Sequence, residues 1–191
     1  MKSAVFLDRD GTVNVDVGHL DRLERLTLFP FAIDAVRLLN QAGFQVVVVT
    51  NQGGVAAGMV EESFVVELHE LLQRRFEAGG ATIAGIYYCP HDPAALVPAY
   101  RTTCDCRKPA AGMLRRAAAE LDLDLSRSYM VGDKWSDVAV AEQVGATGML
   151  VRTGYGVTQE AQAGRPADAL VVDDLMAATV HILERGQGGS H

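Results

Sequence analysis

Two aspartates near the amino terminus have the spacing of a catalytic carboxylate pair. Asp8 and Asp10 lie two positions apart, directly after a short apolar run, and Gly11 follows them. At the end of a strand, both side chains can face one pocket while the glycine lets the chain turn sharply. One carboxylate could attack an electrophile while the other transfers a proton. An isolated pair of this kind is as often a solvated loop, so its interpretation depends on the other polar segments.

Thr50 and Lys108 have the chemistry to bind a phosphoryl group. Thr50 ends a run of four valines. Its hydroxyl, with the backbone amides of Asn51 and Gln52, could bind phosphate oxygens, although a threonine at a strand end is more often a cap or turn residue. Lys108 alone would be a surface lysine, but beside a pentavalent phosphorus it would neutralise charge on the equatorial oxygens.

Two further acidic residues, Asp133 and Asp137, lie four positions apart after another apolar run. They could be a helix N-cap and a first-turn acid, which the helix dipole favours. Magnesium, however, prefers hard oxygen ligands and keeps several waters. The carboxylates of Asp8 and Asp133 with the backbone carbonyl of Asp10 would therefore suffice to bind it, with Asp137 just outside the ligand set.

All three cysteines of the chain lie close to one histidine in sequence. Two tight pairs, Cys89 with His91 and Cys104 with Cys106, flank an aperiodic loop. Three sulfurs and one imidazole complete a tetrahedral zinc shell with no open position, so such a zinc would be structural and would order the loop of residues 89–109. The alternative is a set of buried thiols and a surface histidine.

Apolar runs of strand length alternate with helical patterns along the chain. Most runs are continuous, which is typical of strands buried on both faces. The sequence therefore predicts a doubly wound, Rossmann-like α/β fold with a mostly parallel sheet, in which ligands bind beyond the carboxyl ends of the strands. The expected strands are residues 4–7, 44–49, 83–88, 129–131, 149–151 and 169–172, and the expected helices are residues 31–42, 61–78, 112–123, 136–144 and 174–185.

The bulk composition fits one soluble domain. The chain has 191 residues, 49% of them hydrophobic and 21% charged, which indicates a single domain over residues 1–185 and an unstructured tail over 186–191. A formal net charge of −7 disfavours nucleic-acid binding. No apolar stretch is long enough for a membrane span. We expect a cytoplasmic protein, with nothing in the sequence that requires more than a monomer.

The four polar segments, in this order and after these strands, resemble the haloacid dehalogenase superfamily of phosphohydrolases from Asp8 to Asp137. The resemblance implies that Asp8 forms an aspartyl-phosphate and that Asp10 protonates the leaving oxygen and then activates water. It further implies that Thr50 and Lys108 stabilise the transferring group and that Asp133 binds magnesium. A large cap domain is not expected in so short a chain.

Within the superfamily, the zinc motif resembles the branch of heptose-bisphosphate and histidinol-phosphate phosphatases. Residues 50–58 and 104–109 are more similar to the heptose enzymes, which implies a small phosphorylated sugar as substrate. His19 and Ala57 depart from the family pattern, where tyrosine and arginine are usual. Two alternatives stay open: a histidinol-phosphate phosphatase, and a non-catalytic zinc-organised binding module. The implied substrate-binding residues are Asp16, Val17, Gly18, His19, Asn51, Gln52, Gly53, Arg107 and Lys134.

Three other residues are given no chemical role. His69 and His181 lie within helical patterns, so we expect both at the surface. Trp135 is expected to pack rather than to stack on a ligand.

Overall fold

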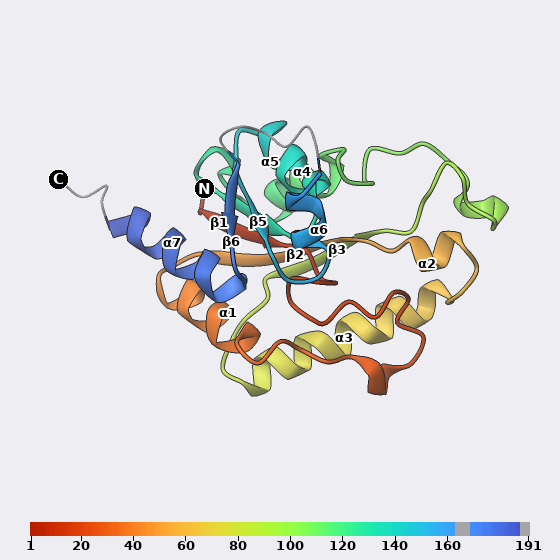
Figure 1. Cartoon of the computed structure of the whole chain (residues 1–191), viewed down its shortest axis with the longest axis horizontal. Helices are drawn as coiled ribbons and strands as arrows, with labels where there is room; N and C mark the ends of the chain where they lie inside the picture. The colour runs from red at the N-terminus through yellow and green to blue at the C-terminus, as the bar shows by residue number, and fades with distance from the viewer. Residues whose placement is uncertain (163–168, 188–191) are drawn as a thin grey trace.

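The computed structural model describes residues 1–162 and 169–187 of the chain. In this part of the chain, six parallel strands form one sheet in the order β3-β2-β1-β4-β5-β6 (Figure 1). This Rossmann-like order confirms the predicted fold class. The strands are β1 (Ala4–Leu7), β2 (Gln45–Asn51), β3 (Gly85–Cys89), β4 (Tyr129–Gly132), β5 (Thr147–Val151) and β6 (Leu170–Val172).

Helices cover both faces of the sheet (Figure 1). One face packs against α1 (Ala32–Gln41), α3 (Glu62–Ala78) and α7 (Leu175–Gln187). The other face packs against α4 (Gly112–Leu121) and α5 (Trp135–Glu142). The sheet is thus the middle layer of three, as the continuous apolar runs predict.

Strand β1 shows why those runs do not alternate in polarity. Its side chains point to opposite faces in turn. Val5 and Leu7 belong to the core under α1, α3 and α7, whereas Ala4 and Phe6 belong to the core under α4 and α5. Because both faces are covered, every position of the strand favours an apolar residue.

Helix α1 follows directly from its sequence pattern. Ala32, Val36 and Leu39 recur at helical spacing and are all buried against the sheet. Gly43 has a φ of +89° and ends the helix, because the Phe44 amide then donates to the Leu39 carbonyl at 3.0 Å. This arrangement is the usual glycine-dependent helix end.

The sequence patterns did not predict the short helices. Helices α2 (Gly53–Ala56) and α6 (Gly156–Glu160) are too short to show a helical period, as are the 3-10 helices Leu23–Arg25, Pro98–Tyr100 and Leu125–Arg127. Helix α7 continues to Gln187, so residues 186 and 187 are helical and not part of a tail. Residues 188–191 of the expected tail lie outside the described residues.

The carboxyl ends of three neighbouring strands bring the polar segments together. Leu7 at the end of β1 pairs with Val48 of β2 and Val131 of β4. Residues that follow these positions therefore share one edge of the sheet, as predicted. Among residues 1–162 and 169–187, no helix combines the length and apolarity that crossing a membrane requires.

The core position Phe76 gives a direct test of this packing. Phe76 of α3 is fully buried, so Phe76→Ala should lower the free energy of unfolding by about 3–5 kcal/mol. Val66, on the exposed side of the same helix, is 43% exposed, and Val66→Ala should change it by less than about 0.5 kcal/mol. Urea unfolding of both variants measures the difference, and equal losses would contradict the assignment of faces.

Candidate active site

Lys108 lies between two carboxylates at the carboxyl edge of the sheet. Its Nζ is 2.8 Å from Asp8 Oδ1 and 2.7 Å from Asp137 Oδ1, and it donates to the Val49 carbonyl at 2.8 Å. Burial opposes a charge here, but the Asp137 and Asp8 carboxylates raise the pKa of Lys108 above its ordinary value. A permanent ammonium therefore lies beside Asp8.

Asn51, at the end of β2, fixes the backbone of Lys108. Its side-chain amide donates to the Lys108 carbonyl at 3.1 Å, and its side-chain oxygen accepts the Lys108 amide at 3.0 Å. These two bonds join positions 57 residues apart and align the lysine with the strand end. Both polar atoms of the Asn51 side chain are therefore hydrogen-bonded to the Lys108 backbone.

Asp133, after β4, is fully buried, and two neighbouring positions must be glycine to leave room for its carboxylate. A Cβ atom at Gly11 or at Gly154 would clash with Asp133 Oδ2, and both glycines have positive φ, +87° and +57°. The same oxygen accepts the Tyr155 amide at 2.8 Å. Burial and the neighbouring Asp8 charge raise the pKa of Asp133 to about 7.

The carboxylates fit a hard divalent cation. Oxygens of Asp8, Asp133 and Asp137 all lie within 4.8 Å of one another. Asp133 Oδ1 is buried without a hydrogen-bond partner among the described residues, and the nearest cation, Lys134 Nζ, is 3.7 Å away. A buried oxygen in this state is suited to a metal ligand, and oxygen donors of this kind are those that Mg²⁺ prefers.

Three neighbouring side chains donate hydrogen bonds to the carboxylate of Asp10. Arg9 donates to both oxygens, at 2.7 Å from Oδ2, Asn14 donates to Oδ1 at 3.0 Å, and Gln52 donates to Oδ2 at 3.2 Å. Burial opposes ionisation, but the charge and hydrogen bonds of Arg9, with those of Asn14 and Gln52, lower the pKa of Asp10. The carboxylate therefore has a fixed orientation.

Two adjoining cavities open at these residues. The smaller contains Asp8, Lys108 and the buried Thr50, and the larger has a volume of about 290 Å³. Asp10, Asn51 and Lys134 line both. A still larger hollow of about 770 Å³ follows β3 and the loop of residues 89–109, but its lining includes none of these carboxylates. The 290 Å³ cavity is lined by Arg9, Asp10, Asp16, Gly18, His19, Leu20, Asn51, Gln52, Gly53, Gly54, Val60, Lys134 and Tyr155.

Two predicted substrate residues are placed differently from the rest. Val17 is exposed at the surface and does not line this cavity. Arg107 points its guanidinium into the loop of residues 89–109, where it donates to the His91 carbonyl at 3.0 Å and pairs with Asp92 at 2.7 Å.

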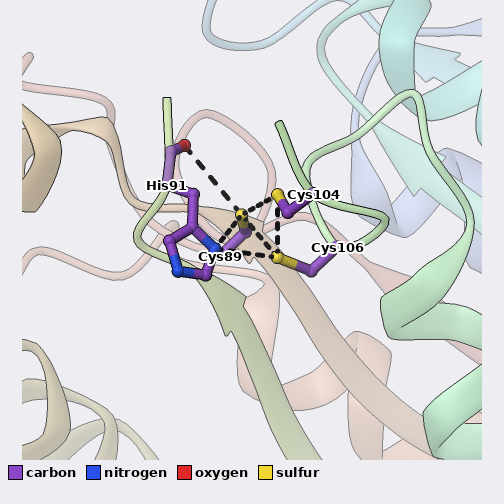
Figure 2. A group of neighbouring side chains, drawn as sticks. All are labelled: Cys89, His91, Cys104 and Cys106. Carbon is purple, nitrogen blue, oxygen red and sulfur yellow. Dashed lines mark hydrogen bonds between the residues drawn. The ribbon is translucent and has the colours of Figure 1, made fainter. Parts of the chain in front are cut away.

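That loop begins and ends at the cysteine-histidine cluster. Figure 2 shows the side chains of Cys89, His91, Cys104 and Cys106 pointing toward one another, and their ligand atoms lie within 4.8 Å. His91 Nδ1 is 3.4 Å from the sulfur of Cys106, and the sulfurs of Cys89 and Cys104 are 3.5 Å apart. None of the three cysteines forms a disulfide. This donor set fits tetrahedral zinc and joins the end of β3 to the segment that carries Lys108.

Comparison with known proteins identifies the family. The chain is 46% identical over 162 residues to D-glycero-beta-D-manno-heptose-1,7-bisphosphate 7-phosphatase of Yersinia pestis, covering 84% of this chain and 86% of the relative. It is 47% identical over 161 residues to the protein of the same name from Escherichia coli K12, covering 83% and 84%. The chain belongs to the heptose-1,7-bisphosphate 7-phosphatase family.

Solved structures and a family model agree with this membership. The D,D-heptose 1,7-bisphosphate phosphatase of B. bronchiseptica, solved with magnesium and phosphate, superposes with a TM-score of 0.86 at 34% identity and covers 96% of this chain and 99% of its own. The model of HAD-hydrolase-like proteins matches residues 105–178. The resemblance to haloacid dehalogenase phosphatases is thereby confirmed.

Sequence reasoning missed several residues of this heptose-phosphatase family site. Tyr155 and Gly154 follow β5 at the same edge as Asp133, so the strand-end rule applied to the fifth strand would have found them. The Tyr155 ring also lies 4.9 Å from Lys134 Nζ. Arg9 and Asn14, in contrast, had no separate signal, because their roles depend on where Asp10 points.

The prediction that His69 is a surface residue is wrong. His69 is 6% exposed, and its Nε2 lies 2.9 Å from the Arg9 guanidinium. Burial and the charge of Arg9 lower the pKa of His69 to about 3. His181, also expected at the surface, is partly buried on α7. The helical pattern of α3 alone does not indicate that His69, on the buried side of the helix, contacts the buried Arg9.

Gly154→Ala tests the enclosure of Asp133. The added methyl group would displace the Asp133 carboxylate, so magnesium-dependent phosphatase activity should fall at least about 100-fold. Gly145→Ala is the matched control, because Gly145 also has positive φ, +74°, but has open space around it. It shares the backbone strain without the clash and should retain activity. Similar kcat values for the two variants would contradict the role of the glycine.

Proposed function

We propose that this chain removes the 7-phosphate of D-glycero-D-manno-heptose 1,7-bisphosphate through an aspartyl-phosphate on Asp8. The observation that carries the proposal is the buried Lys108 ammonium 2.8 Å from the Asp8 carboxylate, in a small cavity that adjoins the one lined by most of the expected sugar-binding residues. The named activity of the relatives supports the choice of substrate. The reaction belongs to the making of nucleotide-activated heptose for lipopolysaccharide.

In the first half-reaction, an Asp8 oxygen attacks phosphorus and the bond to the sugar O7 breaks. Lys108 and the Thr50 hydroxyl neutralise and bind the equatorial oxygens of the transferring group. Asp10 must first take up a proton, which the hydrogen bonds that lower its pKa oppose, and it then gives this proton to the departing O7. The products are the sugar monophosphate and a phosphorylated Asp8.

In the second half-reaction, Asp10 removes a proton from water, which attacks the same phosphorus. The bond between Asp8 and phosphorus breaks, inorganic phosphate leaves, and Asp10 is again protonated. An acyl phosphate is reactive enough for one acid/base residue to hydrolyse it. The fixed orientation of Asp10 between Arg9, Asn14 and Gln52 suits this repeated use.

Asp8, Asp133 and the backbone carbonyl of Asp10 would hold the magnesium ion. When bound, it supplies positive charge that lets the Asp8 carboxylate and a phosphate dianion approach each other. Asp137 is kept out of the ligand set in this proposal, because both of its oxygens already have partners: Oδ1 pairs with Lys108, and Oδ2 accepts the Lys134 amide at 3.1 Å.

The phosphate that does not react needs a counter-charge in the larger cavity. Lys134 supplies one there, and Asp16, Gly18, His19, Gln52 and Gly53 surround the remaining space. For Val17 and Arg107 the role rests on the family resemblance alone. We further propose one phosphatase domain over the predicted residues 1–185 together with residues 186 and 187 at the end of α7, and a monomer that acts in the cytoplasm.

Turnover of heptose bisphosphate and of histidinol phosphate decides the substrate. Phosphate release should show a higher kcat/KM for a heptose 1,7-bisphosphate anomer, and Asp8→Asn should lower kcat at least about 1,000-fold because the nucleophile is lost. Asp122→Asn, an exposed acid paired with the amino terminus, is the control. A preference for histidinol phosphate would overturn the substrate, and near-normal activity of Asp8→Asn would favour the non-catalytic binding module.

Zinc removal tests the structural role of the second metal. Stripping zinc while magnesium is kept should disorder residues 89–109, displace Lys108 and raise KM about 10-fold or more, because Ala95 is the one buried residue between His91 and Arg107. Steady-state kinetics and limited proteolysis of the loop measure this, with zinc restored as the control. Unchanged KM and unchanged cleavage in the zinc-free protein would contradict it.

A further inference from the structure

Arg9 is a fully buried cation between the acid/base residue and a helix that carries none of the proposed catalytic groups. Its side chain is 2% exposed. The Nε and one terminal nitrogen face Asp10, with the shortest distance 2.7 Å. That same nitrogen donates to the Gln52 side-chain oxygen at 3.1 Å, and the other terminal nitrogen lies 2.9 Å from His69 Nε2.

We propose that His69 is a positioning residue for catalysis, which acts by orienting Arg9 and, through it, the carboxylate of Asp10. This inference rests on the proposed acid/base role of Asp10. A guanidinium is planar, with its donors in a fixed arrangement. An acceptor on the edge opposite Asp10 therefore determines the plane in which the other edge meets the carboxylate.

The imidazole of His69 can serve as that acceptor. An arginine has only donors, so the Nε2 atom it faces must carry a lone pair, with the ring proton on Nδ1. Burial beside Arg9 keeps the ring neutral, since both lower the pKa of His69 to about 3. The Tyr88 ring, 5.4 Å from the imidazole between centroids, packs against it.

Helix α3 gives His69 a rigid base. Leu68, Leu72 and Phe76 of the same helix are buried in the core against the sheet. The helix therefore holds His69 at a fixed distance from the end of β1, where Arg9 and Asp10 lie. Through Arg9, the core on this face of the sheet is connected to the orientation of Asp10.

Loss of the acceptor should affect kcat more than KM. Asp10 takes part in both half-reactions, whereas the hydrogen bond of His69 goes to Arg9 and not to a residue proposed to bind the sugar or the phosphate. A displacement of a catalytic group by about 1 Å can lower a rate roughly 100-fold. We therefore expect a fall in kcat of about 10- to 100-fold with KM changed less than about 3-fold.

Two amide substitutions test the inference as a matched pair. In His69→Gln the side-chain oxygen reaches about as far as Nε2 and can accept from Arg9, whereas in His69→Asn the chain is one methylene shorter and does not reach. We expect His69→Gln to keep kcat within about 3-fold of the starting protein and His69→Asn to show the 10- to 100-fold fall. Glu70→Gln, an exposed change at the next position of α3, is the control. Equal kcat values for the Gln and Asn variants would overturn the inference.

Arg9→Lys gives an independent measurement if His69→Asn does not fold. The lysine keeps a buried cation but cannot contact both Asp10 and His69, so we expect the same 10- to 100-fold fall in kcat. A kcat equal to that of the starting protein would overturn the inference.

All variants are assayed with heptose bisphosphate and with p-nitrophenyl phosphate. If the starting protein hydrolyses only the second compound, the substrate proposal fails, and the ratio of the His69 variants on that compound still decides this inference. If the starting protein hydrolyses both and His69→Asn matches it on both, this inference fails and the proposed function stands.

Discussion

Mutual repulsion among three buried carboxylates is the constraint on which the rest of the site depends. Oxygens of Asp8, Asp133 and Asp137 lie within 4.8 Å of one another, where two like charges repel by roughly 4 kcal/mol at an intermediate dielectric constant. Lys108 lies between two of them and offsets part of this repulsion. Asp133 Oδ1, which is buried and has no hydrogen-bond partner within residues 1–162 and 169–187, leaves room for a second positive charge. The excess negative charge of such a site favours binding of a divalent cation, and the bound cation then favours binding of a phosphate group.

The position of Lys108 explains why a second metal site lies nearby. The lysine is 100 residues from Asp8 in sequence and follows a loop that has little core of its own. Two devices bring it to the sheet: Asn51 pairs with its backbone, and the cysteine-histidine cluster connects both ends of the loop (Figure 2). A zinc ion bound there would influence catalysis by holding Lys108 in place, without contact with the substrate.

Each of the two proposed catalytic carboxylates has a buried cation of its own. Asp8 is next to Lys108 from a distant loop, whereas Asp10 is next to Arg9, its neighbour in the chain. The first cation faces the place where phosphorus would be attacked. The second is turned away toward α3, where it orients its carboxylate. The nucleophile and the acid/base residue are in this way given different environments although they lie two positions apart.

The sequence by itself determined the fold class, the strand ends and the chemical type of the site. Continuous apolar runs predicted strands buried on both faces, and Asp8, Thr50 and Asp133 at the ends of three of them predicted a common edge. Local spacing also sufficed to predict that Cys89, His91, Cys104 and Cys106 lie together. These features are encoded by periodicity and by short-range order, which a single chain displays directly.

Only the tertiary structure decided which side chains are partners. It paired Asn51 with the Lys108 backbone, turned Arg107 toward Asp92, buried His69 against Arg9 and enclosed Asp133 between two glycines. Such contacts join positions 15 to 122 residues apart and depend on how helices and loops pack on the sheet. The sequence around one residue does not indicate which distant group will contact it. Polar partners are determined by how the helices and loops pack.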